Sequence, residues 1–249
     1  NDQVIGTERN DRIILGAVTD TADGLGGSDD IIRYDRFGIE TGVTVNLQTG
    51  QASGTWNGLA FDHSLSNIEQ VRGSVGDDSL TATNASDSDL RGNDGNDTLR
   101  GGDQRDELRG GAGDDLLDAS AGAAATQGFG DWIEPGAGSD TIIGHQEDWE
   151  NGGGIDINYD NVEGTGGLVV TLGANGSGTV VSNTADVVND TFTFANWLRG
   201  TGDNDRLVGA DSYGAPNEAF NLRGDAGNDT LIGGGGRENL GGGAGDDLI

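Results

Sequence analysis

Apolar positions recur with a nine-residue period in the middle of the chain. From Gly92 to Asp118 the sequence reads GNDGNDTLR, GGDQRDELR and GGAGDDLLD. Each unit begins with glycine, has an acid at position six and has leucine at position eight. A glycine-rich turn over positions one to six, followed by a very short strand over positions seven to nine, accounts for this pattern. One apolar side chain per unit cannot form a core alone, so we expect the units to stack.

Stacking places identical residue types above one another. If two units make one coil, units eighteen residues apart are neighbours at the usual strand spacing of about 4.8 Å. Leu99 then lies over Leu117, and Asp97 lies over Asp115. Two carboxylates about 5 Å apart repel by roughly 3 kcal/mol at an effective dielectric constant near 20. A cation between them relieves this repulsion, and a flexible cage of carboxylate and backbone carbonyl oxygens favours Ca²⁺ over Mg²⁺.

These units resemble the glycine- and aspartate-rich nonapeptides of the RTX (repeats-in-toxin) family. The resemblance implies an all-β fold, namely a parallel β-roll in which multiple Ca²⁺ ions lie between successive turns. It also implies export by bacterial type I secretion and an extracellular or cell-surface location. Several units in register make the resemblance specific.

Position six of each unit supplies the candidate calcium ligands. They are Asp11, Asp30, Asp78, Asp97, Asp106, Asp115, Asp131, Asp140, Asp205, Asp229, Glu238 and Asp247. The register of GLGGSDDIIRY leaves Asp29 and Asp30 both open, and Asp30 is favoured because Ile32 then continues a strand.

Two of these candidates depart from the repeat. Gln104 and Arg105 replace the expected turn residues beside Asp106, which makes this site the most doubtful of the central three. Glu238 is longer than aspartate by one methylene, so its site should be weaker or differently shaped.

Two similar segments interrupt the nine-residue period. Thr41–Leu47 alternates apolar and polar residues, as a half-buried strand does, and a matching strand recurs at Gly167–Leu172. The units that begin at Gly92 recur from Gly224, so the sequence predicts a tandem duplication. The aromatic residues of the turn-rich stretch that contains Trp56, Leu59 and Phe61 are expected to form the small core of the first insert rather than a platform for sugar stacking.

The predicted organisation has five segments. Residues 1–33 form N-terminal degenerate repeats, 34–72 the first β insert, 73–143 the first β-roll, 144–199 the second β insert, and 200–249 a truncated second β-roll.

Composition agrees with a repeat solenoid and limits the partners. The 249 residues include 48 glycines and only 33% hydrophobic residues, which is little for a conventional core. The formal net charge of −30 disfavours binding to nucleic acid or to an anionic membrane. No apolar run is long enough for a transmembrane helix, so membrane insertion is not expected. The chain has no cysteine, which excludes a disulfide framework.

The sequence offers no recognisable active site, so we expect no enzymatic activity. It has neither a G-x-S-x-G nor an HExxH motif, and its only histidines are His63 and His145. His145 is followed by Glu147 and Asp148, but an exposed turn is a better interpretation than an acid–base or metal role. The expected function is that of a calcium-binding structural module, as in an adhesin or a surface-layer protein, which folds outside the cell when it binds Ca²⁺.

Two further hypotheses concern partners. The module could instead bind polysaccharide, which depends on whether Trp56, Trp149 and Trp197 are exposed on one face or buried in the inserts. Ile249 stands at position eight of a unit, which indicates a segment of a longer array; alternatively, the open coil stacks end to end on another copy.

Overall fold

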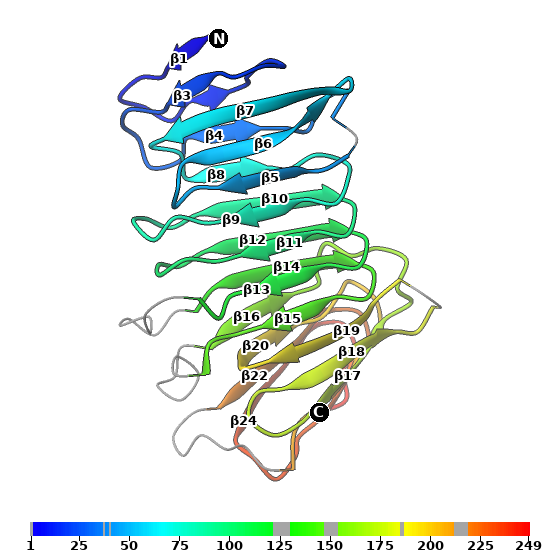
Figure 1. Ribbon diagram of the computed structural model, residues 1–249. Helices are drawn as coiled ribbons and strands as arrows, with labels where there is room; N and C mark the ends of the chain where they lie inside the picture. The colour runs from blue at the N-terminus through cyan, green and yellow to red at the C-terminus, as the bar shows by residue number, and fades with distance from the viewer. Residues whose placement is uncertain are drawn as a thin grey trace.

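The computed structural model describes residues 2–36, 38–39, 41–121, 130–146, 154–184, 187–211 and 219–249. Within this part of the chain, two long β-sheets face each other across one core, and the chain ends lie at opposite ends of the stack (Figure 1). One sheet has fourteen strands and the other has ten. The structure is thus all-β, as predicted. No helix in the described residues has the length and apolar character needed to cross a membrane.

The fourteen-stranded sheet contains, in spatial order, β1 (Gln3–Ile5), β3 (Thr21–Asp23), β7 (Leu59–Ser66), β6 (Gln51–Trp56), β5 (Val43–Asn46), β9 (Ser79–Thr81), β11 (Thr98–Arg100), β13 (Leu116–Asp118), β15 (Thr141–Ile143), β19 (Asn189–Thr193), β18 (Gly178–Ser182), β17 (Leu168–Leu172), β21 (Arg206–Val208) and β23 (Thr230–Ile232). The ten-stranded sheet contains β2 (Arg12–Ile13), β4 (Ile31–Arg33), β8 (Gln70–Arg72), β10 (Asp89–Asp94), β12 (Glu107–Ala112), β14 (Trp132–Ala137), β16 (Ile155–Asn158), β20 (Ala195–Arg199), β22 (Phe220–Ala226) and β24 (Glu238–Ala244).

The repeat units form the predicted parallel β-roll. Successive strands alternate between the two sheets, so two units complete one coil. Strand β11 pairs in parallel with β13, and Leu99 lies opposite Leu117 in this pair. The prediction of an eighteen-residue coil is therefore confirmed for the central units.

Two inward-facing ladders of aliphatic side chains form the core of the roll. Leu80, Leu99, Leu117 and Ile142 come from the larger sheet, and Val71, Leu90, Leu108 and Ile133 come from the smaller one. All eight side chains are at most 1% exposed. Each contributes about 1.5–3 kcal/mol of hydrophobic stabilisation relative to an exposed position, and stacking therefore provides the core that a single unit lacks.

Each insert forms a three-stranded antiparallel meander within the larger sheet. The first meander is β5, β6 and β7, and the second is β17, β18 and β19. The first strand of each meander pairs in parallel with the roll strand that follows it in the chain, and the last strand pairs with a roll strand that precedes it. Each meander therefore starts farther along the sheet and runs back toward the preceding coil. Because each meander has three strands where a plain coil has one, the two meanders explain why this sheet has four more strands than the other.

The aromatic residues of the first meander are only partly in its core. Phe61 is 2% exposed, and Trp56 is half-buried against the core. Leu59, by contrast, is 61% exposed. It lies at the start of β7 and pairs with Trp56 beside the hairpin turn, so it is exposed at the tip of the hairpin although it has the same parity along the strand as the buried Phe61. The meanders are continuous with the roll in the same sheet, and the division into five segments stays a prediction from the sequence.

Candidate metal centre

The position-six acids lie along two edges of the roll. The first edge comprises the turns that lead into strands of the larger sheet. Its position-six acids are Asp78, Asp97, Asp115, Asp140, Asp205, Asp229 and Asp247. The second edge comprises the turns that lead into the smaller sheet, with Asp11, Asp30, Asp106, Asp131 and Glu238.

Aspartates of the first edge form a ladder of hydrogen bonds along the stacking direction. The backbone N–H of Asp97 donates to Asp115 Oδ1 at 2.8 Å, and the N–H of Asp115 donates to Asp140 Oδ1 at 2.8 Å. In the second copy, the N–H of Asp205 donates to Asp229 Oδ1 at 2.8 Å. The fold therefore brings these acids into one column, with Asp97 over Asp115.

The second oxygen of four of these carboxylates has no hydrogen-bond donor. These oxygens are the Oδ2 atoms of Asp97, Asp115, Asp140 and Asp229, and all four are buried. Burying a charged group without a partner is strongly unfavourable. Burial raises the pKa of Asp97 and of Asp115 to about 7, against a usual value of 3.8. Burial, followed by the charge of Asp190, also raises the pKa of Asp140. A cation at this edge would satisfy the unpaired oxygens.

Backbone carbonyl oxygens of the next coil converge on the same points. A Cβ atom at Gly92 would clash with Asp97 Oδ2 and would lie 2.7 Å from the carbonyl oxygen of Gly110. A Cβ at Gly224 would likewise clash with Asp229 Oδ2 and lie 2.8 Å from the carbonyl oxygen of Gly242. Glycine at position one of these two turns avoids a clash, because the space beside it faces an acid from its own turn and a carbonyl from the next.

This donor set fits calcium. Ca²⁺ takes six to eight oxygen ligands from carboxylates, backbone carbonyls and water. In the described residues, no three acidic, histidine or cysteine side chains surround one point. An ion at the first edge would therefore take a carboxylate from each of two coils and its remaining ligands from backbone carbonyls and water.

Comparison with known families agrees with this geometry. Residues 91–123, 190–212 and 221–249 match the family model described as the RTX calcium-binding nonapeptide repeat (4 copies). The chain carries RTX calcium-binding repeats. The matched segments cover about a third of the chain. They include the three units of residues 92–118, whose resemblance to RTX repeats is confirmed. No curated protein matches the sequence.

Several turns of the first edge share an unusual backbone. Positions two and four of the turn at 110–115 are Gly111 and Gly113, with φ of 125° and 129°. Gly136 and Gly138 repeat this conformation with φ of 101° and 146°. This left-handed region favours glycine, which explains the glycines at these two positions.

Two turns of the second edge have a different backbone. No residue of the turns at 6–11 and 101–106 has a positive φ. Asp106 accepts backbone hydrogen bonds on both oxygens, from Ser88 at 2.9 Å and from Gly102 at 2.5 Å. Backbone donors thus satisfy Asp106 without a cation. Its role as a metal ligand stays a prediction that the geometry does not favour.

The other second-edge candidates vary. Asp30 is buried and accepts the N–H of Asp11 at 2.7 Å, whereas Asp29 is exposed, so Asp30 is the member of the column. Asp131 Oδ1 accepts the N–H of Asp106 at 2.7 Å. Glu238 lies opposite Phe220 rather than opposite another acid, and its Oε1 is buried without a hydrogen-bond partner.

Two members of the first edge do not stand at position six of any predicted unit. Asp20 accepts the N–H of Asp2 at 2.7 Å, and Asp190 accepts the N–H of Asp140 at 2.9 Å. Asp190 was assigned to an insert because the nonapeptide period does not reach it. A local signal exists, because Asn189-Asp190-Thr191 repeats the Asn-Asp-Thr of residues 96–98 and 228–230.

His63 takes the place of such an aspartate in the first meander. Ser64, which follows His63, pairs with Thr21 where the last strand of the first meander meets the preceding roll strand. Thr191, which follows Asp190, pairs with Thr141 at the same place in the second meander. The Nε2–H of His63 donates to the carbonyl of Gly16 at 3.2 Å, which leaves Nδ1 to accept the Tyr34 hydroxyl at 3.2 Å. Burial lowers the pKa of His63, in agreement with a neutral ring. The residues Glu147, Asp148 and Trp149, which follow His145, lie outside the described residues.

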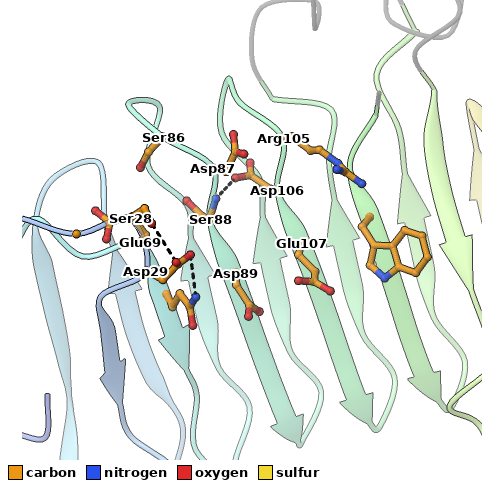
Figure 2. Close-up of a pocket in the computed structure, with 13 residues that line it drawn as sticks. Ser28, Asp29, Glu69, Ser86, Asp87, Ser88, Asp89, Arg105, Asp106 and Glu107 are labelled. Atoms are coloured by element: carbon orange, nitrogen blue, oxygen red, sulfur yellow. Dashed lines mark hydrogen bonds between the residues drawn. The ribbon is translucent and has the colours of Figure 1, made fainter. Parts of the chain in front are cut away.

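A groove lies beside the second edge, over the outer face of the smaller sheet. Its volume is about 820 Å³, and its lining includes Glu69, Asp89, Glu107, Arg105 and Trp132. Figure 2 shows Asp89 and Glu107 on neighbouring strands, with Arg105 on a turn beside them. The groove is predominantly acidic and is separate from the column of the first edge.

Proposed function

We propose that this chain is a calcium-folded structural module of a secreted or cell-surface bacterial protein. The observation that carries the proposal is the row of buried Oδ2 atoms without donors at Asp97, Asp115, Asp140 and Asp229. Without a cation, the fold brings these like charges together and removes them from water. With Ca²⁺ between the coils, the binding free energy becomes free energy of folding, because the unfolded chain has no preformed sites.

The cellular location follows from the same coupling. Extracellular calcium modules typically have dissociation constants of about 10⁻⁴–10⁻³ M. Such sites would be empty at the low calcium concentration of the cytosol and filled outside the cell. This supports type I secretion of an unfolded chain that folds after export, as in an adhesin or a surface-layer protein. The proposed role is structural and involves no catalysis.

Circular dichroism during a calcium titration tests this proposal. We expect a cooperative gain of β signal with Ca²⁺ and little gain with Mg²⁺, whose octahedral geometry suits this flexible cage poorly. A spectrum that is already fully β in excess chelator would contradict calcium-coupled folding.

Polysaccharide binding is the second candidate function, and exposed aromatic residues favour it. Trp197 is 37% exposed, and Trp132 is half-buried; both stand in register with Asp156 of the strand between them. The two indoles are thus two strands apart, about 10 Å, on the outer face of the smaller sheet. Trp56 is half-buried against the core, and Trp149 lies outside the described residues.

Binding of neutral soluble polysaccharides to the calcium-loaded protein tests this candidate. Neutral glycans are the appropriate probe because the net charge of −30 repels acidic ones. Retardation in a glycan-containing native gel that is lost in Trp197→Ala and kept in Trp56→Ala would support the outer face as the binding surface. No retardation by any glycan would contradict this function.

End-to-end assembly stays a prediction. Sedimentation velocity with and without Ca²⁺ tests it, because stacking of open coils predicts calcium-dependent growth with protein concentration. A monomer under all these conditions would exclude it.

A further inference from the structure

The carboxylates of the first edge differ in how their oxygens are satisfied, and the difference follows their place between the meanders. The column has two uninterrupted runs, one from Asp78 to Asp190 and one from Asp205 to Asp247. Each run begins directly after the first strand of a meander, because Val43 N–H donates to Asp78 and Leu168 N–H donates to Asp205, both at 2.6 Å. The Oδ2 atoms without donors belong to aspartates inside these runs.

A residue with a hydroxyl group satisfies the first aspartate of each run. Ser74 donates its N–H to Asp78 Oδ2 at 2.6 Å and its hydroxyl to Asp78 Oδ1 at 2.8 Å. Thr201 repeats both bonds to Asp205, at 2.7 Å and 3.1 Å. The two copies thus begin their runs with the same arrangement.

On the first edge, the backbone at position two distinguishes these two turns from the turns whose aspartate keeps an unpaired Oδ2. Ser74 and Thr201 occupy position two with ordinary negative φ. In the turns whose aspartate keeps a free Oδ2, position two has positive φ: Asn93 at 84°, Gly111 at 125°, Gly136 at 101° and Asp225 at 76°. In none of these turns does the position-two N–H donate to the carboxylate, and the Oδ2 stays available for a cation.

A third hydroxyl closes the far end of the first run. Tyr159 is fully buried, and its hydroxyl donates to Asp190 Oδ2 at 2.6 Å. Beyond Asp190 the larger sheet continues with the antiparallel strand β18, which brings no further turn of this kind. Protein hydroxyl groups therefore stand at both ends of the run.

We propose that Ser74 and Thr201 are caps that take the place of Ca²⁺ at the first level of each run, and that Tyr159 caps the second oxygen of Asp190 at the far end of the first run. Ions then lie between the coils of Asp97 and Asp115, of Asp115 and Asp140, of Asp140 and Asp190, and of Asp229 and Asp247. The levels that begin at Asp78 and Asp205 hold no ion. This inference rests on the proposed calcium binding and goes beyond it, because it assigns ions to particular levels and names the residues that exclude them elsewhere.

The chain contains a matched control for the tyrosine cap. Tyr34 is 2% exposed and precedes the first meander as Tyr159 precedes the second. Its hydroxyl bonds to His63, which replaces the carboxylate. Removing the hydroxyl therefore frees a carboxylate oxygen in Tyr159→Phe but frees only an imidazole nitrogen in Tyr34→Phe.

Counting bound Ca²⁺ by equilibrium dialysis tests the caps. We expect the ion between Asp140 and Asp190 to have a dissociation constant at least about threefold lower in Tyr159→Phe than in the parent protein. The reason is that Asp190 gains a free oxygen for this ion. Tyr34→Phe should leave the affinity and the number of ions unchanged. Equal affinities in the parent and in Tyr159→Phe would overturn the tyrosine cap.

A second substitution keeps the proposal testable if Tyr159→Phe does not fold. Ser74→Gly converts GSVGDD to GGVGDD, which has the glycine of the ion-binding turns at position two. We expect this variant to bind one more Ca²⁺ than the parent. The control is Ser28→Gly, since Ser28 is an exposed second-edge residue that bonds Asp29, and it should bind the parental number. An unchanged count in Ser74→Gly would contradict the caps, whereas a parent protein that binds no calcium would contradict the proposed function itself.

Discussion

Asp115 is shared by two levels of the column, which distinguishes it from the exposed acids of the same edge. Its Oδ1 accepts the N–H of Asp97, and its own N–H donates to Asp140. Asp115→Ala should raise the calcium concentration at the folding midpoint by about tenfold or more, equivalent to about 1.4 kcal/mol or more. The loss removes a ligand from two adjacent sites at once. The midpoint is measured by circular dichroism.

Asp94→Ala is the control for this substitution. Asp94 is exposed in the turn that contains Asp97, and exposed charges contribute little to stability. The control should keep the parental midpoint. Similar shifts in both variants would mean that the calcium midpoint depends on net charge alone rather than on the stacked column.

Protonation should substitute for the cation in the calcium-free protein. Burial raises the pKa of Asp97 and Asp115 to about 7 from 3.8, so the folded state binds protons more tightly than the unfolded state. These groups therefore favour folding fully below about pH 4, and this contribution is lost as the pH rises through about 7. Without calcium, the urea midpoint should be higher at pH 5 than at pH 8.

The double variant Asp97→Asn, Asp115→Asn isolates these two carboxyls. Asparagine is neutral at every pH and has nearly the same shape, so the pH dependence of the calcium-free midpoint should become flatter. A parental slope in this variant would assign the pH dependence to the remaining acids of the chain.

The sequence predicts which residues form the column better than it predicts their state. The rule that position six is acidic predicts Asp97 and Asp115 as members of the column. It does not predict Asp190, because the nine-residue period ends before this residue. The free oxygen of Asp97 and the satisfied oxygens of Asp78 could not be told apart from position six. That difference depends on φ at position two, and the only sequence signal is serine or threonine at that position in place of glycine, asparagine or aspartate.

At the scale of strands, three-residue elements such as β11 are stable only as members of a ladder. Leu99 is fully buried between Leu80 and Leu117. Leu99→Ala should lower the free energy of unfolding in saturating calcium by about 2–5 kcal/mol, the usual cost of a cavity left by leucine. Urea denaturation with excess Ca²⁺ measures this change.

Leu59→Ala is the matched control at the same scale. Leu59 is 61% exposed on β7, and exposed substitutions usually change stability by about 0.5 kcal/mol or less. Equal losses in the two variants would be incompatible with a core built from the ladder.

The sequence did not predict the order of the strands within the meanders. The alternation of Val43 and Val45 correctly indicated a half-buried strand, now β5. It did not indicate that β5 pairs with β9 while β7 pairs with β3. Such pairing depends on which strand edges are open in the assembled sheet, and neither local propensity nor period contains that information.

At the scale of the whole molecule, the net charge and the glycine content favour an expanded chain in the absence of calcium. The formal charge of −30 is concentrated on a roll whose first edge stacks acids at each level. Self-repulsion opposes compaction, and 48 glycines increase the conformational entropy that folding must overcome. Ca²⁺ acts against both terms, because each ion cancels charge and also links two coils.

The radius of gyration should therefore change sharply with calcium. For 249 residues, scaling relations give about 55 Å for an unfolded chain and about 18 Å for a compact one, and an elongated roll lies somewhat above the lower value. Small-angle X-ray scattering in chelator at pH 8 should approach the larger radius, and saturating Ca²⁺ should bring it near the smaller one. Sodium chloride at equal ionic strength is the control, because it screens charge without linking coils. Compaction by sodium chloride alone would show that screening is sufficient and that the linkage between coils is not needed for the fold.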